Sequence, residues 1–227
     1  MKYVVLINGP ASAGKDTFVK LVHELARFKE TGGCRISVRS ISAVDRIKCA
    51  ASDLGWRGEK DDKSRAMLSD LKDLADKHLN ATLNYIFDEI DSADVGYCRG
   101  KHRYATSFEP VEYVATGDAI KFARAERVTQ STILFVCVRE PKDARAVYDR
   151  YANNPDVTVT GVYISRTAVN KVNSNHADVA AQTRDSDLFP YLIRNDGSLG
   201  DLMNAAEQFV DTLLTYKMQP KVPTYAV

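Results

Sequence analysis

The sequence lacks paired cysteines, a strong net charge and any long hydrophobic run. Its four cysteines are scattered with no C-x-x-C pair, so neither a disulfide framework nor a zinc site is expected. The formal net charge is only +1, which argues against a broad nucleic-acid or membrane surface. The apolar run at residues 3–7 is too short for a signal peptide or a membrane span. We therefore predict a cytoplasmic protein with no membrane partner.

What the sequence contains is an ordinary globular composition with alternating strand and helix patterns. Hydrophobic residues make up 44% of the 227 residues and charged residues 27%, enough for one sizeable α/β domain. Strands are predicted at residues 3–7, 35–41, 133–138, 157–164 and 191–193. Helices are predicted at residues 18–26, 43–54, 64–90 (with a break near residue 80), 118–127, 141–151 and about 199–216. This alternation predicts a three-layer α/β fold built on a parallel sheet.

A glycine-rich loop follows the first predicted strand. Residues 9–17, Gly-Pro-Ala-Ser-Ala-Gly-Lys-Asp-Thr, fit the pattern G-x-x-x-x-G-K, with threonine one residue later than the usual Ser/Thr. Between a buried strand and an amphipathic helix, the backbone N–H groups of residues 11–16 would surround a phosphate at the positive end of the helix. The predicted phosphate-binding residues are Gly9, Ala11, Ser12, Ala13, Gly14, Lys15, Asp16 and Thr17. This pattern indicates a P-loop nucleotide-binding protein.

The same loop supplies candidates for catalysis and for a metal ion. Lys15 would reach the β and γ phosphate oxygens of ATP, and Thr17 would lie near Mg²⁺. Asp16 would hold Mg²⁺ or a water, or it would only favour the positive end of the helix, and the sequence leaves both open. ATP as phosphoryl donor and Mg²⁺ are therefore the expected cofactors.

Other classes of P-loop protein find less support in the sequence. The base-recognition motif N-K-x-D of GTPases is absent, and the strand at 133–138 runs into Cys-Val-Arg-Glu (137–140) instead of ending in the acidic residue of an ATPase motor. Arginines follow two predicted strands, at Arg139 and Arg166. Kinases of small molecules use such arginines to neutralise charge on the moving phosphoryl group. The candidate catalytic residues are therefore Lys15, Arg139 and Arg166.

These motifs resemble those of P-loop nucleoside monophosphate kinases. The loop at 9–17 is similar to that of bacteriophage deoxynucleoside monophosphate kinases, and animal-type phosphomevalonate kinases share its Gly-Lys-Asp. The resemblance covers residues 1–90 loosely and 133–215 better. In the C-terminal third, the motifs that follow the order of the phage enzymes are Val162-Tyr163-Ile164-Ser165-Arg166, His176-Ala177-Asp178, Arg184-Asp185-Ser186-Asp187-Leu188 and Ile193-Arg194-Asn195-Asp196-Gly197-Ser198-Leu199. One departure is Cys137, where the family tends to have Asp.

The resemblance implies further roles and a domain layout. Arg166 is similar to the family's lid arginine. Proteins of this fold class usually bind the acceptor after the second strand, which makes Asp45 and Lys48 candidate acceptor-binding residues, although both also suit an ordinary charged helix start. Arg65, early in the long predicted helix, is a further candidate for the acceptor phosphate. The implied layout is a single P-loop kinase domain over residues 1–216, with an insertion at about 92–130, a lid at about 166–187, and an extended or disordered tail at 217–227.

Together these features predict ATP-dependent phosphoryl transfer to a (deoxy)nucleoside monophosphate, giving the diphosphate. The implied partners are small-molecule nucleotides, with a homodimer left open. The implied location is the cytoplasm, that of the host if the chain is of phage origin. Three alternatives stay open: a kinase for another phosphorylated small molecule, such as a phosphomevalonate-like acceptor; a nucleotide-binding regulatory protein without turnover; and a nucleic-acid end kinase using the basic and aromatic stretch 97–104. The near-neutral charge argues against the last of these.

Overall fold

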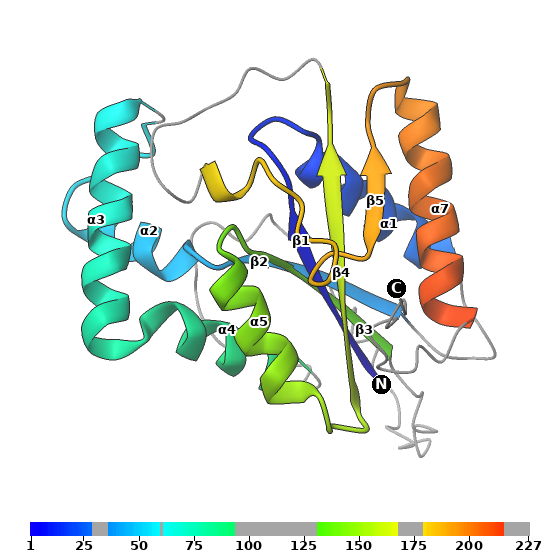
Figure 1. Ribbon diagram of the computed structural model, residues 1–227, viewed down its shortest axis with the longest axis horizontal. Helices are drawn as coiled ribbons and strands as arrows, with labels where there is room; N and C mark the ends of the chain where they lie inside the picture. The colour runs from blue at the N-terminus through cyan, green and yellow to red at the C-terminus, as the bar shows by residue number, and fades with distance from the viewer. Residues whose placement is uncertain (29–35, 60, 94–130, 168–178, 216–227) are drawn as a thin grey trace, which may run out of the picture.

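The computed structural model describes residues 1–28, 36–59, 61–93, 131–167 and 179–215 (Figure 1). Within these ranges, five parallel strands form one sheet with the order β2-β3-β1-β4-β5. The strands are β1 (Lys2–Asn8), β2 (Ile36–Ser42), β3 (Ser131–Cys137), β4 (Val157–Ser165) and β5 (Tyr191–Arg194). The helices are α1 (Lys15–Phe28), α2 (Asp45–Asp53), α3 (Asp62–Leu79), α4 (Ala81–Asp91), α5 (Pro141–Tyr151) and α7 (Leu199–Thr215).

Helices cover both faces of this sheet, which gives three layers (Figure 1). On one face, Val5 of β1 packs in a cluster with Phe18 of α1 and Phe209 of α7. On the other face, Val4 of β1 belongs to a cluster with Ile86 of α4 and with α5. Every residue of β1 is buried. A central strand of a parallel sheet is buried on both faces, which explains why β1 has an unbroken apolar run and no alternation.

The sheet topology creates a crevice at the carboxyl ends of β1 and β3. These two strands are neighbours in the sheet. The helix that follows β1 is α1, on one face, and the helix that follows β3 is α5, on the other face. In parallel α/β sheets, ligands bind outside the carboxyl ends of strands at the point where the connections diverge in this way. The glycine loop follows β1 and Arg139 follows β3, so the topology brings both to this crevice.

The predicted α/β fold is confirmed at the level of a parallel sheet with helices on both faces. The predicted strands and the described helices agree with the structure to within a few residues. The long helix predicted at 64–90 is divided at Asn80, whose positive φ of 47° ends α3 and starts α4. The predicted helix at 118–127 and the tail at 217–227 lie outside the described residues. None of the described helices is both long and apolar enough to span a membrane.

Candidate functional site

The glycine loop takes a path that only glycine permits at two positions. Gly9 and Gly14 have φ angles of 139° and 100°, which residues with side chains rarely adopt. A Cβ on Gly9 would collide with the carbonyl of Ile164 on β4, and a Cβ on Gly14 would collide with the side chain of Asn195. The loop therefore packs closely against the end of β4 at Gly9 and against the side chain of Asn195, which follows β5, at Gly14.

Two asparagine side chains form hydrogen bonds with the backbone of the glycine loop. Asn8 Oδ1 accepts a hydrogen bond of 2.6 Å from the backbone N–H of Gly9. Asn195, which follows β5, donates from Nδ2 to the carbonyl of Ala13 at 2.9 Å. The motif that contains Asn195 carried the resemblance to the phage enzymes, but its direct contact with the loop was not foreseen. These bonds fix the loop before α1 begins at Lys15, and the positive end of α1 points into the loop.

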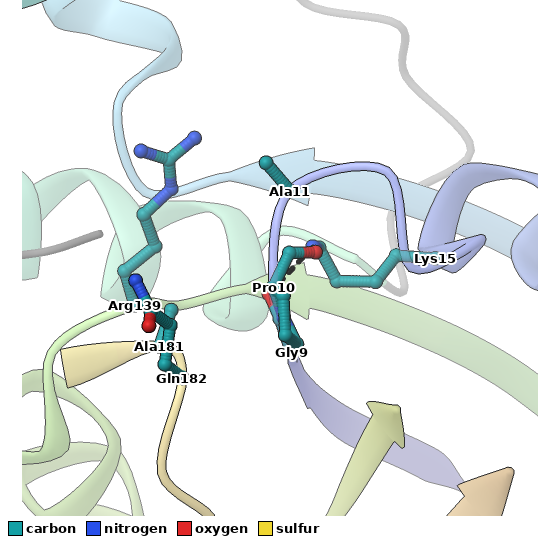
Figure 2. A pocket seen from close by; sticks show the side chains of 7 residues that line it. All are labelled: Gly9, Pro10, Ala11, Lys15, Arg139, Ala181 and Gln182. Atoms are coloured by element: carbon teal, nitrogen blue, oxygen red, sulfur yellow. Dashed lines mark hydrogen bonds between the residues drawn. The ribbon is translucent and has the colours of Figure 1, made fainter. Parts of the chain in front are cut away.

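Lys15 lies back over the loop that precedes it (Figure 2). Its Nζ donates to the carbonyls of Gly9 at 2.7 Å and Pro10 at 2.6 Å. These partners are neutral oxygens at the mouth of the loop. A phosphate oxygen carries more negative charge than a carbonyl, so an anion at this position would be a stronger partner for the ammonium group. The geometry suits a lysine that recognises an anion beside the loop.

A first pocket lies between the loop and the end of β3 (Figure 2). It is lined by Gly9, Pro10, Ala11, Lys15, Arg139, Ala181 and Gln182. Figure 2 shows the Arg139 side chain across the pocket from the Pro10–Ala11 turn and Lys15. The predicted catalytic residues Lys15 and Arg139 therefore do meet in one place, as the positions after β1 and β3 require.

Gln182 is a pocket residue that sequence reasoning missed. It lies in the described part of the predicted lid, and this part packs on the sheet. Tyr163 Oη on β4 donates to the carbonyl of Ala181 at 3.1 Å, and a Cβ on Gly161 would collide with the carbonyl of Leu188. No local motif marks Gln182, because its place beside Lys15 depends on how residues 179–189 return across β4.

A second pocket lies on the α1 side of the loop, with a volume of about 400 Å³. It is lined by Ser12, Gly14, Lys15, Asp16, Thr17, Arg166, Asn195, Gly197, Leu199 and Leu202. This volume falls in the range of small-molecule sites. Lys15 lines both pockets, whereas Arg139 lines the first and Arg166 the second. The two predicted catalytic arginines therefore lie on different sides of the glycine loop.

Asp16 and Thr17 are the described residues beside the loop that fit Mg²⁺. Both stand exposed in the first turn of α1 and line the second pocket. Their oxygens are the donors that Mg²⁺ prefers, and Mg²⁺ in nucleotide sites commonly takes only one or two protein ligands. No group of three or more His, Cys, Asp or Glu side chains forms a metal site in the described ranges.

Cys137 stands at the end of β3, where a carboxylate was expected from the resemblance. Burial, reinforced by the nearby charge of Asp16, raises the pKa of Cys137 to about 11. The thiol is therefore protonated and neutral near pH 7. The charges of Lys15, Asp45 and Lys48 also act on this thiol, so the ends of β2 and β3 and the start of α1 come close together.

The predicted acceptor-binding residues line neither of the two pockets. Asp45 accepts a hydrogen bond of 2.7 Å from the N–H of Ser42 and pairs with Lys48 at 3.2 Å, which stabilises the turn from β2 into α2. Arg65 lies 3.5 Å from Asp62 in the first turn of α3. Asp45 and Lys48 are close enough to the end of β3 to act on the Cys137 thiol, whereas Arg65 pairs within its own helix.

A second concentration of charge, not foreseen from the sequence, lies between α3 and the turn that follows β3. Lys72 Nζ is 2.7 Å from Asp76, 2.9 Å from Glu140 and 3.6 Å from Asp143. Lys72, Glu140 and Asp143 are buried. We call these four residues the buried charge cluster. The only sequence signal was Lys72 itself, which interrupts the apolar spacing of the predicted helix between Leu68 and Ala75.

The pKa values show how strongly these charges interact. Burial alone would lower the pKa of Lys72, but hydrogen bonds to Asp76 and Glu140 raise it above its ordinary value. Burial alone would raise the pKa of Glu140, yet Lys142 and Lys72 lower it. Burial raises the pKa of Asp143 to about 6, with Lys72 opposing and Glu140 adding to the rise. Among the described residues, none hydrogen bonds to Asp143 Oδ2.

No protein-family profile matches this sequence, and no curated protein matches it. The class of this protein is therefore described from its fold and its site. The chain is an α/β protein whose central strand β1 runs into a glycine loop and the positive end of α1. Its particular activity is argued from the site alone.

Proposed function

We propose that this chain binds Mg·ATP on the glycine loop and transfers its γ-phosphate to a (deoxy)nucleoside monophosphate. The observation that carries the proposal is the place of Lys15. It contacts the carbonyls of Gly9 and Pro10 in the glycine loop, and its side chain lines both pockets. A reaction that joins a donor and an acceptor at one phosphoryl group needs two such sites on either side of a cation.

The second pocket is the better place for the nucleoside of the donor. Its walls include Leu199 and Leu202, which offer apolar surface to a base, and Arg166, which offers positive charge to the phosphates. Asp16 and Thr17 lie in the same pocket and would hold Mg²⁺ there, where the ion neutralises phosphate charge. The triphosphate would then run along the loop toward Lys15.

The first pocket has a volume of only about 10 Å³, room for about one water, so no whole nucleotide would enter it, and the transfer itself would take place at its mouth. Arg139 and Lys15 would place two positive charges around the moving phosphoryl group, and Gln182 would add a neutral amide that can donate a hydrogen bond to its oxygens. The acceptor would approach from the ends of β2 and β3, where Asp45 and Lys48 lie. Positioning and electrostatics supply most of the rate in phosphoryl transfer, so a general base is not required.

A panel assay tests this proposal. ADP release by the full chain is measured with Mg·ATP and each common nucleoside and deoxynucleoside monophosphate in turn, and with phosphomevalonate. We expect one or a few monophosphates to stimulate ADP release, and Lys15→Met to abolish the stimulation. Lys20→Met, an exposed lysine on the same helix, is the matched control and should behave as wild type. Stimulation by phosphomevalonate alone would support the other small-molecule kinase instead.

A nucleotide-binding protein without turnover is the second candidate, and Cys137 favours it. The neutral thiol at the end of β3 cannot supply the negative charge that the resemblance led us to expect. Tight binding of Mg·ATP with no stimulation by any acceptor in the panel would support this candidate. Restoring the carboxylate with Cys137→Asp would then be expected to raise acceptor-dependent ADP release.

A further inference from the structure

Helix α3 is attached to the rest of the protein in an unusual way. It lies at one edge of the molecule beside α2 and α4 (Figure 1). Of its 18 residues, all of which the structure describes, only Lys72 is buried. An amphipathic helix normally buries an apolar stripe. The deepest contact of α3 is instead a cation placed among the carboxylates of the buried charge cluster.

The partner of Lys72 across the fold stands next to Arg139. Glu140 Oε1 accepts the hydrogen bond of 2.9 Å from Lys72, and Glu140 is the residue directly after Arg139. The side chain of Glu140 is buried, at 6% exposed, whereas the side chain of the preceding Arg139 is exposed at the first pocket. The direction of Arg139 therefore depends on the backbone at residues 139 and 140.

The same backbone is contacted from the other side by Asn8, the last residue of β1. Asn8 Nδ2 donates to the carbonyl of Arg139 at 3.5 Å, while its Oδ1 accepts from Gly9 at 2.6 Å. The Arg139–Glu140 peptide thus lies between two anchors, with Asn8 and the loop on one side and Lys72 on the other. The same Nζ of Lys72 also donates to Asp76. The carboxylate of Asp76 in turn accepts a hydrogen bond of 2.8 Å from the N–H of Thr82 at the start of α4.

We propose that Lys72 and Glu140 are positioning residues that hold Arg139 in the crevice and link its position to α3. This inference rests on the proposed function, because it assigns the two residues to the same reaction. Lys72 and Glu140 do not touch the substrates. They act through Arg139, whose side chain they keep at the first pocket, across from the glycine loop.

The experiment is a double-mutant cycle on acceptor-dependent ADP release. The variant Lys72→Met/Glu140→Gln removes both members of the hydrogen-bonded pair, because removing one alone leaves the other buried charge with one partner fewer and endangers folding. Asp143 loses Lys72 in this variant, and burial, which already raises its pKa, favours its uncharged form. It is measured in the wild-type background and in the Arg139→Ala background. Lys77→Met, an exposed lysine on α3, is the matched control and should leave kcat unchanged.

A residue that acts only through Arg139 has no effect once Arg139 is gone. We expect the double variant to lower kcat on the order of tenfold, with the Kd for Mg·ATP unchanged, and to cause no further loss in the Arg139→Ala background. Loss of folding alone would lower the active fraction in both backgrounds equally, so this readout separates positioning from a structural role. Active-site titration with a tight nucleotide analogue gives the active fraction.

Three results would overturn the inference. The first is a double variant with wild-type kcat while Arg139→Ala is impaired, which leaves the proposed function standing. The second is an equal loss in both backgrounds, which would make the pair structural. The third is Arg139→Ala with full activity while Lys15→Met is inactive, because then there is no catalytic arginine at this position to hold. Full activity of Lys15→Met would instead overturn the proposed function itself.

Discussion

Two lysines occupy opposite kinds of environment in this protein. Lys15 is half-buried at the mouth of the glycine loop and donates to two neutral carbonyls. Lys72 is 6% exposed and lies among three carboxylates. Neutral carbonyls can be exchanged for a phosphate at little cost, whereas buried carboxylates need their cation at all times. The comparison separates a lysine placed for a ligand from a lysine placed for the fold.

The largest effect should come from Lys15, and mainly on activity. Lys15→Met removes the ammonium group that faces the phosphates, and acceptor-dependent turnover should fall on the order of a thousandfold. The free energy of unfolding should change by about 1 kcal/mol, less than for Lys72, since Lys15 is half-buried and the carbonyls of Gly9 and Pro10 to which it donates are neutral. Urea unfolding and the ADP-release assay measure the two quantities. A strongly destabilised Lys15→Met would contradict the view that Lys15 is placed for a ligand and not for the fold.

The next largest effect should come from Lys72, and mainly on stability. Lys72→Met leaves the buried Asp143 without Lys72 and leaves Glu140 paired with the exposed Lys142, which should cost about 3 kcal/mol of unfolding free energy. The same urea titration measures it, with Lys77→Met as the exposed control on α3. If Lys72→Met unfolds at the wild-type midpoint, the buried charge cluster does not stabilise the fold as we describe.

A third prediction concerns pH and uses Asp143. Its pKa is about 6 in the folded protein and about 3.9 when unfolded. Between these values the folded state binds more protons, so ionisation of Asp143 reduces stability as the pH rises from about 4 to 6 and gives no further change above. Asp143→Asn removes this loss. Relative to wild type, the variant should gain roughly 2–3 kcal/mol between pH 4 and pH 7.

The comparison between variant and wild type is needed because Glu140 and Asp76 act in the opposite direction. Their pKa values are lowered in the folded state, so their contribution to stability is present above their unfolded pKa values and is lost as the pH falls. Taking the difference between Asp143→Asn and wild type at each pH cancels much of their effect. A difference that stays flat from pH 4 to pH 7 would show that Asp143 titrates normally.

The smallest effect should come from Gln182. Gln182→Glu keeps the shape of the side chain but adds a negative charge beside Lys15 and Arg139, so it should lower kcat about tenfold by opposing the phosphates. Gln208→Glu, an exposed position on α7, is the matched control and should have wild-type kcat. Equal kcat values for Gln182→Glu and Gln208→Glu would show that Gln182 does not act on the phosphoryl group at the first pocket.

The sequence predicted the glycine loop well because the loop is a local structure. A buried strand, two glycines at fixed spacing and an amphipathic helix are all visible within residues 3–26, and neighbours along the chain determine the geometry. The predicted meeting of Lys15 and Arg139 also depended only on parallel strands ending at the same edge of the sheet.

The buried charge cluster could not be predicted in the same way. Lys72 and Glu140 are separated by 68 residues along the chain, and their contact depends on how far α3 is rotated about its axis. A lysine in a helical pattern is normally solvated, so only its place between apolar neighbours hinted at burial. Gln182 and Asn8 were missed for a related reason, because single side-chain amides carry no motif of their own.

The central claim is that the loop and Lys15 bind the triphosphate of a nucleotide. Calorimetric titration of Mg·ATP into the wild-type chain and into Lys15→Met tests it most directly. We expect one nucleotide to bind per wild-type chain, and binding at least tenfold weaker in the variant. A wild-type chain that takes up neither Mg·ATP nor Mg·GTP would contradict the account.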